Sequence, residues 1–339
     1  MTTLHVGIDI AKASFVPALH WHGQGRRLDP LTNTPEGFAA LAQAVIQAQH
    51  QLGADAVHLI MEPTAGYELA LAAFALAQGW MVSLPNPRHV REWARGIGRR
   101  AKTDPQDALL LARYGADCRP PAWHPLPAEV ADVEQMLRRK EDLEQMLRQE
   151  RNRQGALAQR PGVPAAVPQS LERMIGALEE ELAALEEAIK QHLAQHAELR
   201  AEARRLRTVP GIGAKNVLWV LVLLYRWQTL TEGQGDAKGL VAYAGLDPQP
   251  YDSGTSVHKR PMISRMGNPV LRRRLFLSAL GGVRGRNVLR AFYQRLVGRG
   301  KAKKAALIAA ARKILVWAWA VFRQHTTFDP AKVTRELAV

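Results

Sequence analysis

The order of strand-like and helix-like segments in the first third of the chain limits its fold more than any other feature of the sequence. The apolar run Leu4–Ile10 predicts a buried strand. The segments Ser14–His20 and Arg27–Leu31 predict two more strands, separated by a turn around Gly23–Gly25. Connections this short predict an antiparallel meander of three strands.

Helical patterns then alternate with further strands. A helix is predicted from its N-cap Thr34 to about Leu52, with Pro35 at its first position. A strand at Ala56–Met61, an apolar helix at Tyr67–Gln78 and a strand at Met81–Leu84 follow. The order βββαβαβα, a meander followed by βα units, is the layout of a ribonuclease H-like α/β domain.

Two acidic residues belong to these predicted strands. Asp9 lies between Ile8 and Ile10, where an unpaired buried carboxylate would cost several kcal/mol, so we expect a cation to face it. Glu62 directly follows the second long strand, which Pro63 ends. Both acids are therefore expected at an edge or tip of one sheet.

Asp104 and Asp107 complete a quartet of acids. They open the helical run Leu109–Tyr114, and their spacing of three places both on one helix face. Helix capping could explain Asp104, but it explains neither Asp107 nor Asp9. Four carboxylates form an oxygen-rich site that suits Mg²⁺, two ions in the simplest arrangement with Mn²⁺ able to substitute, and such sites transfer phosphodiesters.

Positive charge is concentrated in one region of the chain. The formal net charge is +15, and 17 of the 46 Lys and Arg residues lie between Asp252 and Asp329, where there is no acidic residue. The remainder of the chain is close to neutral. One-signed clustering of this kind favours a nucleic acid as partner over a merely solvated basic face.

The middle of the chain predicts a helical hairpin. A proline-rich linker at 120–128 ends the first domain, 1–119. From Leu171 to Leu206 the apolar positions step alternately by four and three, which is typical of a coiled-coil seam. A weaker helix precedes it, so we expect an antiparallel coiled-coil hairpin over 129–206 that assembles a homodimer or homotetramer. His192 and His196 on the seam are interpreted as packed residues rather than metal ligands.

The last predicted domain, 207–339, is basic and mainly α-helical. It opens with Thr208-Val209-Pro210-Gly211-Ile212-Gly213, a sequence like the glycine turn of a helix-hairpin-helix, whose backbone amides can hold a DNA phosphate. A simple turn between helices is the alternative. The residues expected to contact nucleic acid are Arg88, Arg91, Arg95, Lys102, Gly211, Gly213, Lys215, Lys259, Arg260, Arg265, Arg272 and Arg273.

Several motifs together resemble one family. They are Gly7-Ile8-Asp9-Ile10-Ala11-Lys12, Met61-Glu62-Pro63-Thr64, Asn86 to Arg91, Lys102 to Ala108, Leu111 to Tyr114, Leu206 to Gly213, Tyr243 to Pro248, Ser253-Gly254, and Gly267-Asn268-Pro269 to Arg273. This set, which spans nearly the whole chain, is similar to that of the DEDD transposases, the Piv/MooV-type invertases and guide RNA-dependent insertion-sequence recombinases. The resemblance implies a RuvC-like N-terminal domain, a coiled-coil middle and a C-terminal transposase domain.

The resemblance also implies a role for Ser253. It would attack DNA and form a transient phosphoserine link, with metals at the acidic quartet activating it. From the residues alone Ser253 lies in a polar turn, where serine commonly bonds the backbone, and Ser256 and Ser264 compete for the role. Thr255 departs from the family's usual Ser-Gly-Gly-Lys form. The family further implies a structured guide RNA that pairs with donor and target DNA.

Two other functions fit parts of the sequence. A metal-dependent nuclease or junction resolvase that uses water would need the quartet but not Ser253, and a non-catalytic nucleic-acid-binding regulator would need neither. The single cysteine, Cys118, fits a reducing compartment. With no apolar run of membrane-spanning length and no signal peptide, we expect a cytoplasmic, nucleoid-associated protein of a prokaryote.

Overall fold

A computed structural model of the chain describes the backbone of residues 2–98, 104–253 and 257–332, and their side chains apart from 104–106, 250–253 and 257–261. The chain divides into two compact units. The first is Met1–Pro125 with Thr229–Thr231, and the second is Leu126–Gln228 with Glu232–Val339. Each unit has its own hydrophobic core.

The first unit is built on a mixed sheet with the order β3-β2-β1-β5-β6, and β4 also pairs with β2. β1 and β2 are antiparallel, whereas β5 is parallel to both β1 and β6. The predicted order of a meander followed by βα units is thus present. The strands are β1 (Thr3–Ile10), β2 (Ser14–Trp21), β3 (Gln24–Arg27), β4 (Leu31–Thr32), β5 (Ala56–Met61) and β6 (Met81–Ser83).

The third strand begins earlier than the sequence predicted. Trp21 pairs with Gln24 across a two-residue turn. His22 and Gly23 in that turn have φ values of 44° and 82°. Positive φ at both central residues is the geometry of a type I′ turn, whose twist matches that of a tight β-hairpin. The chain therefore reverses at His22–Gly23 rather than around Gly23–Gly25.

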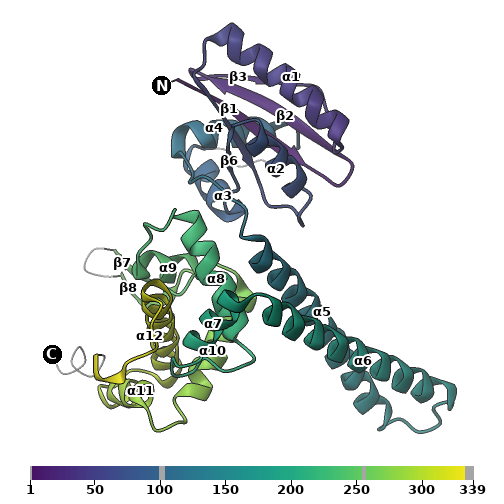
Figure 1. Cartoon of the computed structure of the whole chain (residues 1–339), viewed down its shortest axis with the longest axis vertical. Helices are drawn as coiled ribbons and strands as arrows, with labels where there is room; N and C mark the ends of the chain where they lie inside the picture. The colour runs from purple at the N-terminus through teal and green to yellow at the C-terminus, as the bar shows by residue number, and fades with distance from the viewer. Residues whose placement is uncertain (1, 99–103, 254–256, 333–339) are drawn as a thin grey trace. The chain divides into compact units, whose positions relative to one another are not determined.

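Helices cover both faces of the sheet (Figure 1). The face that carries Leu4, Val6 and Ile8 packs against α1 (Pro35–Leu52) and α2 (Leu69–Ala77). α1 begins as predicted, because the Thr34 side chain accepts a hydrogen bond from the Gly37 amide. Strand residues of the opposite parity, such as Ile60, pack against α3 (Pro87–Gly96) and α4 (Asp104–Cys118).

α4 lies directly on β1 at Gly7. A Cβ atom added at Gly7 would stand 2.0 Å from the Ala108 carbonyl oxygen and 2.3 Å from the Ala112 nitrogen. Further along the helix, a Cβ added at Gly115 would meet the Ile60 side chain at 2.4 Å and a His5 ring nitrogen at 3.2 Å. α4 therefore runs antiparallel to β1, and its first turn lies toward the carboxyl end of that strand.

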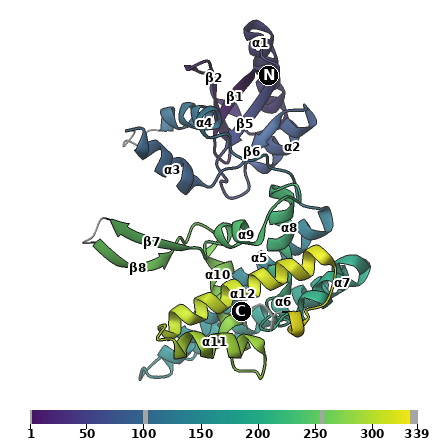
Figure 2. The same cartoon turned by 90° about the vertical axis from the view of Figure 1, so that its left-hand side faces the viewer.

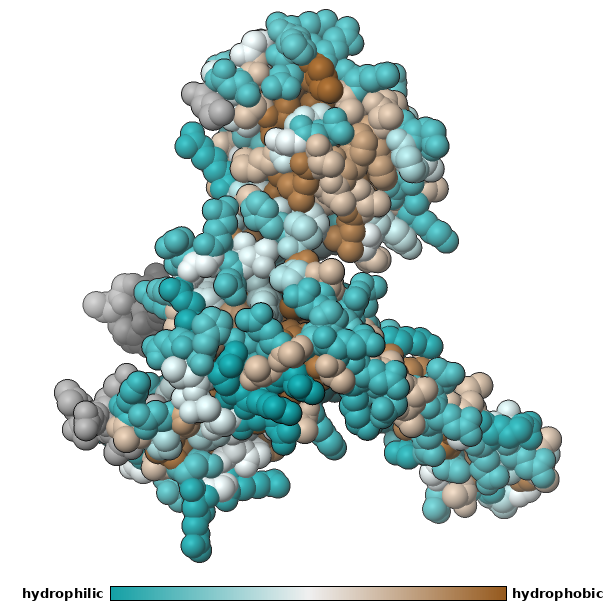
Figure 3. Space-filling view, in the orientation of Figure 1, coloured by the Kyte–Doolittle hydropathy of each residue, from teal (hydrophilic) through white to brown (hydrophobic). Residues whose placement is uncertain are grey.

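The second unit contains a long helical hairpin of α5 (Ala128–Leu157) and α6 (Ala166–Gln195). Leu143, Leu147 and Leu178 are buried between the two helices. Lys140 pairs with Glu186 at 2.6 Å and Arg151 with Glu179 at 2.5 Å, so the helices are antiparallel. Most of the hairpin's visible surface is hydrophilic (Figure 3).

The apolar seam of the hairpin is interrupted at His196. This residue leaves the helical region at φ −109° and ψ 83°, and a new helix, α7 (Ala197–Leu206), begins after it. His192 contacts the Glu129 carbonyl oxygen at 2.8 Å through Nε2, and its ring lies 4.4 Å from that of His196. These contacts agree with the interpretation of both histidines as packed residues.

The rest of the second unit is mainly helical, as predicted. Its core gathers around α12 and also takes in Val130, Val133 and Ile189 of the hairpin. β7 (Pro248–Ser253) and β8 (Val257–Ile263) form a separate antiparallel hairpin (Figure 2). The remaining helices are α8 (Val217–Leu230), α9 (Ala237–Tyr243), α10 (Pro269–Gly282), α11 (Val288–Gly298) and α12 (Lys303–Gln324).

α12 is long and apolar enough to cross a membrane by length and composition, which the sequence analysis did not expect. In the structure 61% of its most apolar window is buried. Ile314, Leu315 and Ala318 are fully buried within the second unit. The burial gives α12 the position of a core helix, and its apolar composition follows from that position.

We predict that Gly7→Ala destabilises the first unit, because the new methyl group would collide with helix backbone rather than with a flexible side chain. Overpacking of this kind costs about 1–3 kcal/mol, or more where backbone must move. The measurement is thermal or urea unfolding of the full chain. Gly96→Ala is the matched control, since nothing lies within 4 Å of a Cβ at Gly96. Equal stability of the two variants would contradict the prediction.

Candidate active site

Asp9 and Glu62 lie at the carboxyl ends of two neighbouring parallel strands. Ile8 pairs with Met61, so the next residues on each strand are neighbours. Parallel strands are about 4.8 Å apart, which brings the two acids into one locality. Asp9 has the parity of Gly7, and Glu62 that of Ile60, so strand alternation places both on the α4 face.

Asp9 is less buried than the sequence predicted. Its side chain and that of Glu62 are half-buried. Ile8 and Ile10 are buried as expected, but they point to the other face of the sheet from Asp9 and pack against α1 and α2. A carboxylate with partial solvent contact loses less hydration, so Asp9 does not require a permanent cationic partner within the protein.

The first turn of α4 brings the other two acids to the same end of the sheet. Ala108 and Ala112 lie over Gly7, so residue 104, one turn earlier, is on the same helix face and toward Asp9. Asp107 is half-buried. The Asp104 side chain lies outside the described residues, as does the whole of Lys102. The topology thus gathers Asp9, Glu62 and the start of α4.

The donors at this end of the sheet fit a hard divalent cation. Carboxylate oxygens are the ligands that Mg²⁺ prefers, and half-buried carboxylates are open to an ion and to phosphate oxygens. Among the side chains that the structure describes, no group of three or more His, Cys, Asp or Glu residues is close enough to hold a metal. The Asp104 side chain is outside the residues to which this statement applies.

Glu68 is a carboxylate at this site that the sequence analysis missed. It is only 4% exposed, and its Oε2 accepts hydrogen bonds from the amides of Thr64 at 2.9 Å and Gly66 at 3.1 Å. These bonds close the turn that follows Glu62, in which Ala65 and Gly66 have positive φ. Glu68 is therefore a positioning residue. In the sequence, a glutamate two residues after Gly66 was the signal that could have identified it.

α3 presents the three predicted arginines to solvent. Asn86 caps the helix by accepting from the Arg88 amide, while Val90 and Ala94 face the core. Arg88, Arg91 and Arg95 are exposed on the other side. Arg88 forms an i,i+4 ion pair with Glu92 at 3.2 Å, in which both side chains are more than half exposed. Such a pair contributes little stability and leaves the arginine available.

Ser253 is the last residue of β7 and pairs with Val257 at the end of the β7–β8 hairpin. The sequence predicted only a polar turn here. The Ser253 side chain and the whole of Ser256 lie outside the described residues. Ser264 is 6% exposed, and its hydroxyl donates to the Asp247 carboxylate. The Ser264 hydroxyl is therefore engaged in a hydrogen bond at the base of the hairpin.

Two glycines brace the base of this hairpin. A Cβ at Gly245, where φ is 68°, would stand 2.6 Å from the Gly267 nitrogen. A Cβ at Gly267 would stand 2.3 Å from the Tyr243 carbonyl oxygen. Backbone therefore packs on backbone at the point where the hairpin leaves the helical body. This close approach explains why glycine stands in both of the C-terminal motifs.

The glycine turn Thr208–Gly213, at the start of the predicted domain 207–339, has two different sides. Gly211, with φ 96°, is packed against Ile314 and the Ser278 carbonyl oxygen, where a Cβ would meet them at 2.7 and 2.9 Å. Gly213 and Lys215 are exposed. A cavity of about 530 Å³ lies between this turn and the end of α10. Gly211 thus has a packing role, and Gly213 and Lys215 face the open side.

Arg272 and Arg273, the two predicted basic contacts in α10, have partners within the protein. Arg272 donates to the Gly267 carbonyl oxygen. Arg273 and Arg274 both pair with Glu141 of α5, and Arg274 also lies 4.9 Å from the Trp219 ring centroid. Arg265 is exposed with φ 56°. Lys259 and Arg260 belong to β8, and their side chains are outside the described residues.

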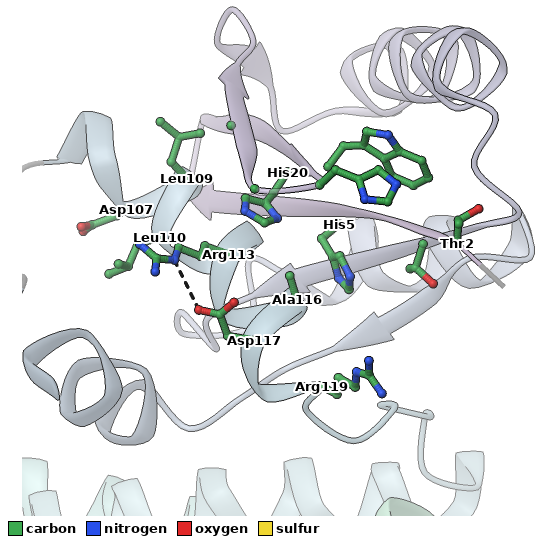
Figure 4. A pocket seen from close by; sticks show the side chains of 15 residues that line it. Thr2, His5, His20, Asp107, Leu109, Leu110, Arg113, Ala116, Asp117 and Arg119 are labelled. Carbon is green, nitrogen blue, oxygen red and sulfur yellow. Dashed lines mark hydrogen bonds and ion pairs between the residues drawn. The ribbon is translucent and has the colours of Figure 1, made fainter. Parts of the chain in front are cut away.

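A cavity of about 960 Å³ opens beside α4 in the first unit (Figure 4). His5 and His20, which are paired across β1 and β2, lie on its floor. The Arg113–Asp117 ion pair, at 3.3 Å, lies on its wall with Asp107. Burial lowers the pKa of both histidines, so they are neutral at pH 7.

His58 continues this histidine row into the core. Its Nε2 lies 2.8 Å from Ser83 Oγ, which donates its own hydrogen to the carbonyl oxygen of Pro120 or Pro121. Ser83 therefore accepts from His58, which places the His58 proton on Nε2. The other nitrogen, Nδ1, is buried without a partner among the described residues. Burial, followed by the neighbouring His5, lowers the pKa of His58 to about 4.

Two family profiles and several related proteins match this chain. A family profile for DEDD transposases of the IS110 type matches residues 6–160, and one for the IS116/IS110/IS902 transposase family matches residues 203–294. A pilin gene-inverting protein of Moraxella lacunata is 35% identical over 330 residues, which are 97% of this chain and 98% of its own. Its Moraxella bovis counterpart has the same identity and coverage.

A protein of insertion element IS900 from Mycobacterium paratuberculosis is 31% identical over 219 residues, which are 60% of this chain and 50% of its own. The first family profile covers Asp9, Glu62, Asp104 and Asp107, and the second covers Ser253. Both groups of motif residues thus lie within matched segments.

We predict that the first unit loses stability as the pH falls from 6.5 toward 4. In this range an unfolded histidine with a pKa of 6.5 takes up a proton, whereas folded His58, with its pKa of about 4, does not. The full difference corresponds to roughly 3 kcal/mol for this residue. His58→Gln should flatten the dependence of the urea midpoint on pH, and an unchanged slope would contradict the assignment. His50→Gln, a change at the exposed end of α1, is the control.

Proposed function

The chain belongs to the IS116/IS110/IS902 family of transposases and is a DNA recombinase, and from that premise we propose how its residues carry out the reaction. The proposal rests above all on the convergence of Asp9, Glu62 and the first turn of α4 at one end of the sheet. This convergence supports a RuvC-like assignment for the domain 1–119, because the acids meet where βα connections place functional residues.

In the proposed mechanism the acids Asp9, Glu62, Asp104 and Asp107 hold divalent cations, Mg²⁺ or Mn²⁺. When bound, such ions stabilise the charge that develops on the attacking and leaving oxygens of a phosphodiester. Glu68 keeps the turn after Glu62 closed. Gly7 allows the backbone of α4 to lie close against β1, which brings the start of α4 to the end of the sheet that carries Asp9.

Ser253 is the proposed nucleophile. Its Oγ forms a bond to a DNA phosphorus atom, one bridging P–O bond of the strand breaks, and the serine proton leaves to the released oxygen. A hydroxyl end of DNA reverses the step by attacking the phosphoserine. The position of Ser253 on a hairpin strand, and the occupation of Ser264 by Asp247, favour Ser253 over Ser264.

Further parts of the proposal concern partners and organisation. The helices α5 and α6 correspond to the proposed coiled-coil hairpin over 129–206, which would join copies into a homodimer or homotetramer after the linker at 120–128. The domain 207–339 carries the serine and the basic surface. A structured guide RNA would pair with donor and target DNA, and the protein would act in the cytoplasm of a prokaryote, at the nucleoid.

We predict that Ser253→Ala abolishes a covalent protein–DNA adduct. The purified protein would be incubated with end-labelled DNA, guide RNA and Mg²⁺, denatured, and separated by electrophoresis. Ser256→Ala is the matched control and should retain the adduct. An adduct that survives Ser253→Ala would exclude this nucleophile, and strand cutting without any adduct would favour a nuclease that uses water.

We also predict that Asp9→Asn and Glu62→Gln reduce chemistry by about 100-fold or more while they leave DNA affinity largely unchanged. Loss of a hydrogen-bond partner of a metal ligand already costs about 10–100-fold, and loss of the ligand itself should cost at least as much. Asp29→Asn is the control, since Asp29 is an exposed acid of the same unit. Full activity of the quartet variants would favour a non-catalytic role for these acids.

A further inference from the structure

Seven cationic side chains are concentrated at the two ends of α11. All seven are exposed, and the sequence between Asp252 and Asp329 supplies no acid to neutralise them. In the part of the chain that the structure describes, none of them has an ion-pair partner. The first cluster is Arg284, Arg286 and Arg290, and the second cluster is Arg299, Lys301, Lys303 and Lys304.

Several other cations of this unit differ from these seven. Arg273 and Arg274 are bound to Glu141, and Arg226 is bound to Glu134. On the hairpin, Arg151, Arg153 and Lys190 are exposed, but each is paired with a glutamate. The seven cations at α11 thus stand out because they are close together in the sequence, within a region that has no acid. Figure 3 shows hydrophilic side chains projecting from this part of the surface.

The two clusters are held at a set distance by the fold. α11 has 11 residues, which corresponds to about 16 Å at 1.5 Å per residue. Asn287 caps the helix by accepting from the amides of Leu289 and Arg290. Leu289 is fully buried, and α11 runs alongside α12 (Figures 1 and 2). Measured along the axis of a DNA duplex, about 16 Å corresponds to the rise of roughly five nucleotides of one strand.

The first cluster directly follows a segment that packs against the glycine turn. A Cβ at Gly282 would stand 2.8 Å from the Gly211 Cα atom, so the end of α10 packs against that turn. Arg284 follows two residues later. The first cluster therefore begins two residues after Gly282, which lines the cavity bounded by Gly213 and Lys215.

The segment lacks an aromatic platform. Its two aromatic residues, Phe292 and Tyr293, are half-buried, and Phe292 packs against the core. Single-stranded nucleic acid is usually bound through exposed aromatic rings on which bases stack. Cations without such rings suit the phosphates of a duplex, whose bases are already stacked.

We propose that α11 and its two flanking turns form a binding surface for the sugar–phosphate backbone of double-stranded DNA. The first cluster contacts phosphates beside the glycine turn, and the second cluster contacts phosphates about five nucleotides away. This surface rests on the chain's function as a DNA recombinase, but it does not depend on the acidic quartet or on Ser253. It also moves the main phosphate contacts away from Arg272 and Arg273.

The test is the salt dependence of duplex binding by the full chain, in EDTA so that no chemistry occurs. In Arg284→Gln/Arg286→Gln/Arg290→Gln, the slope of log K against log salt should fall by about two to three, since each lost phosphate contact removes about 0.9. The quadruple glutamine variant of the second cluster should lose about three to four. Affinity at 0.1 M salt should fall by about tenfold or more in each.

Arg151→Gln/Arg153→Gln/Lys190→Gln is the matched control, because it removes three exposed cations that are paired with glutamates. Its slope should change by less than about one. The proposal is overturned if the control loses as much slope as the first-cluster variant, or if neither cluster variant changes. A loss of affinity that appears only with an RNA duplex or with single-stranded DNA, and not with a DNA duplex, would overturn the proposal as well. Because metals are absent, failure of the proposed Ser253 mechanism leaves these outcomes unaffected.

Discussion

The contact between the backbone of α4 and that of β1 at Gly7 determines the geometry of the first unit's acidic end. With no side chain on Gly7, the carbonyl of Ala108 and the nitrogen of Ala112 lie where any Cβ would stand. This contact sets both the height of the helix above the sheet and its direction. Because α4 runs antiparallel to β1, its acidic first turn lies at the end where Asp9 and Glu62 leave the strands.

The face of the sheet that packs against α4 carries acids at one end and histidines at the other. The carboxyl end has half-buried acids that keep partial contact with water. The other end has the histidines His5, His20 and His58, which burial keeps neutral. Neutral histidines spare the buried side chains at this end the desolvation cost of a charge.

Arginines in the second unit serve two physical purposes. Arg226 and Arg274 are bound to Glu134 and Glu141, whose side chains are 10% and 13% exposed, and these pairs join α5 to α8 and α10. Removal of the arginine from such a pair would leave a largely buried carboxylate, so these residues belong to the architecture. The seven cations at the two ends of α11 have no such partners among the described residues, and their charge remains available to a polyanion.

Patterns along the chain were sufficient to predict the strands of the meander, the βα units, the helical hairpin and the family. Periodicity and turn chemistry are local properties, and the motif residues are contiguous or nearly so. The sequence could not decide what depends on long-range packing. The turn at His22–Gly23, the break at His196, the half-exposure of Asp9 and the role of Glu68 were decided by tertiary contacts. Likewise, a count of charges treats Arg273 and Arg290 as equal. The fold pairs Arg273 with Glu141 and leaves Arg290 exposed to solvent, because packing decides which charges meet.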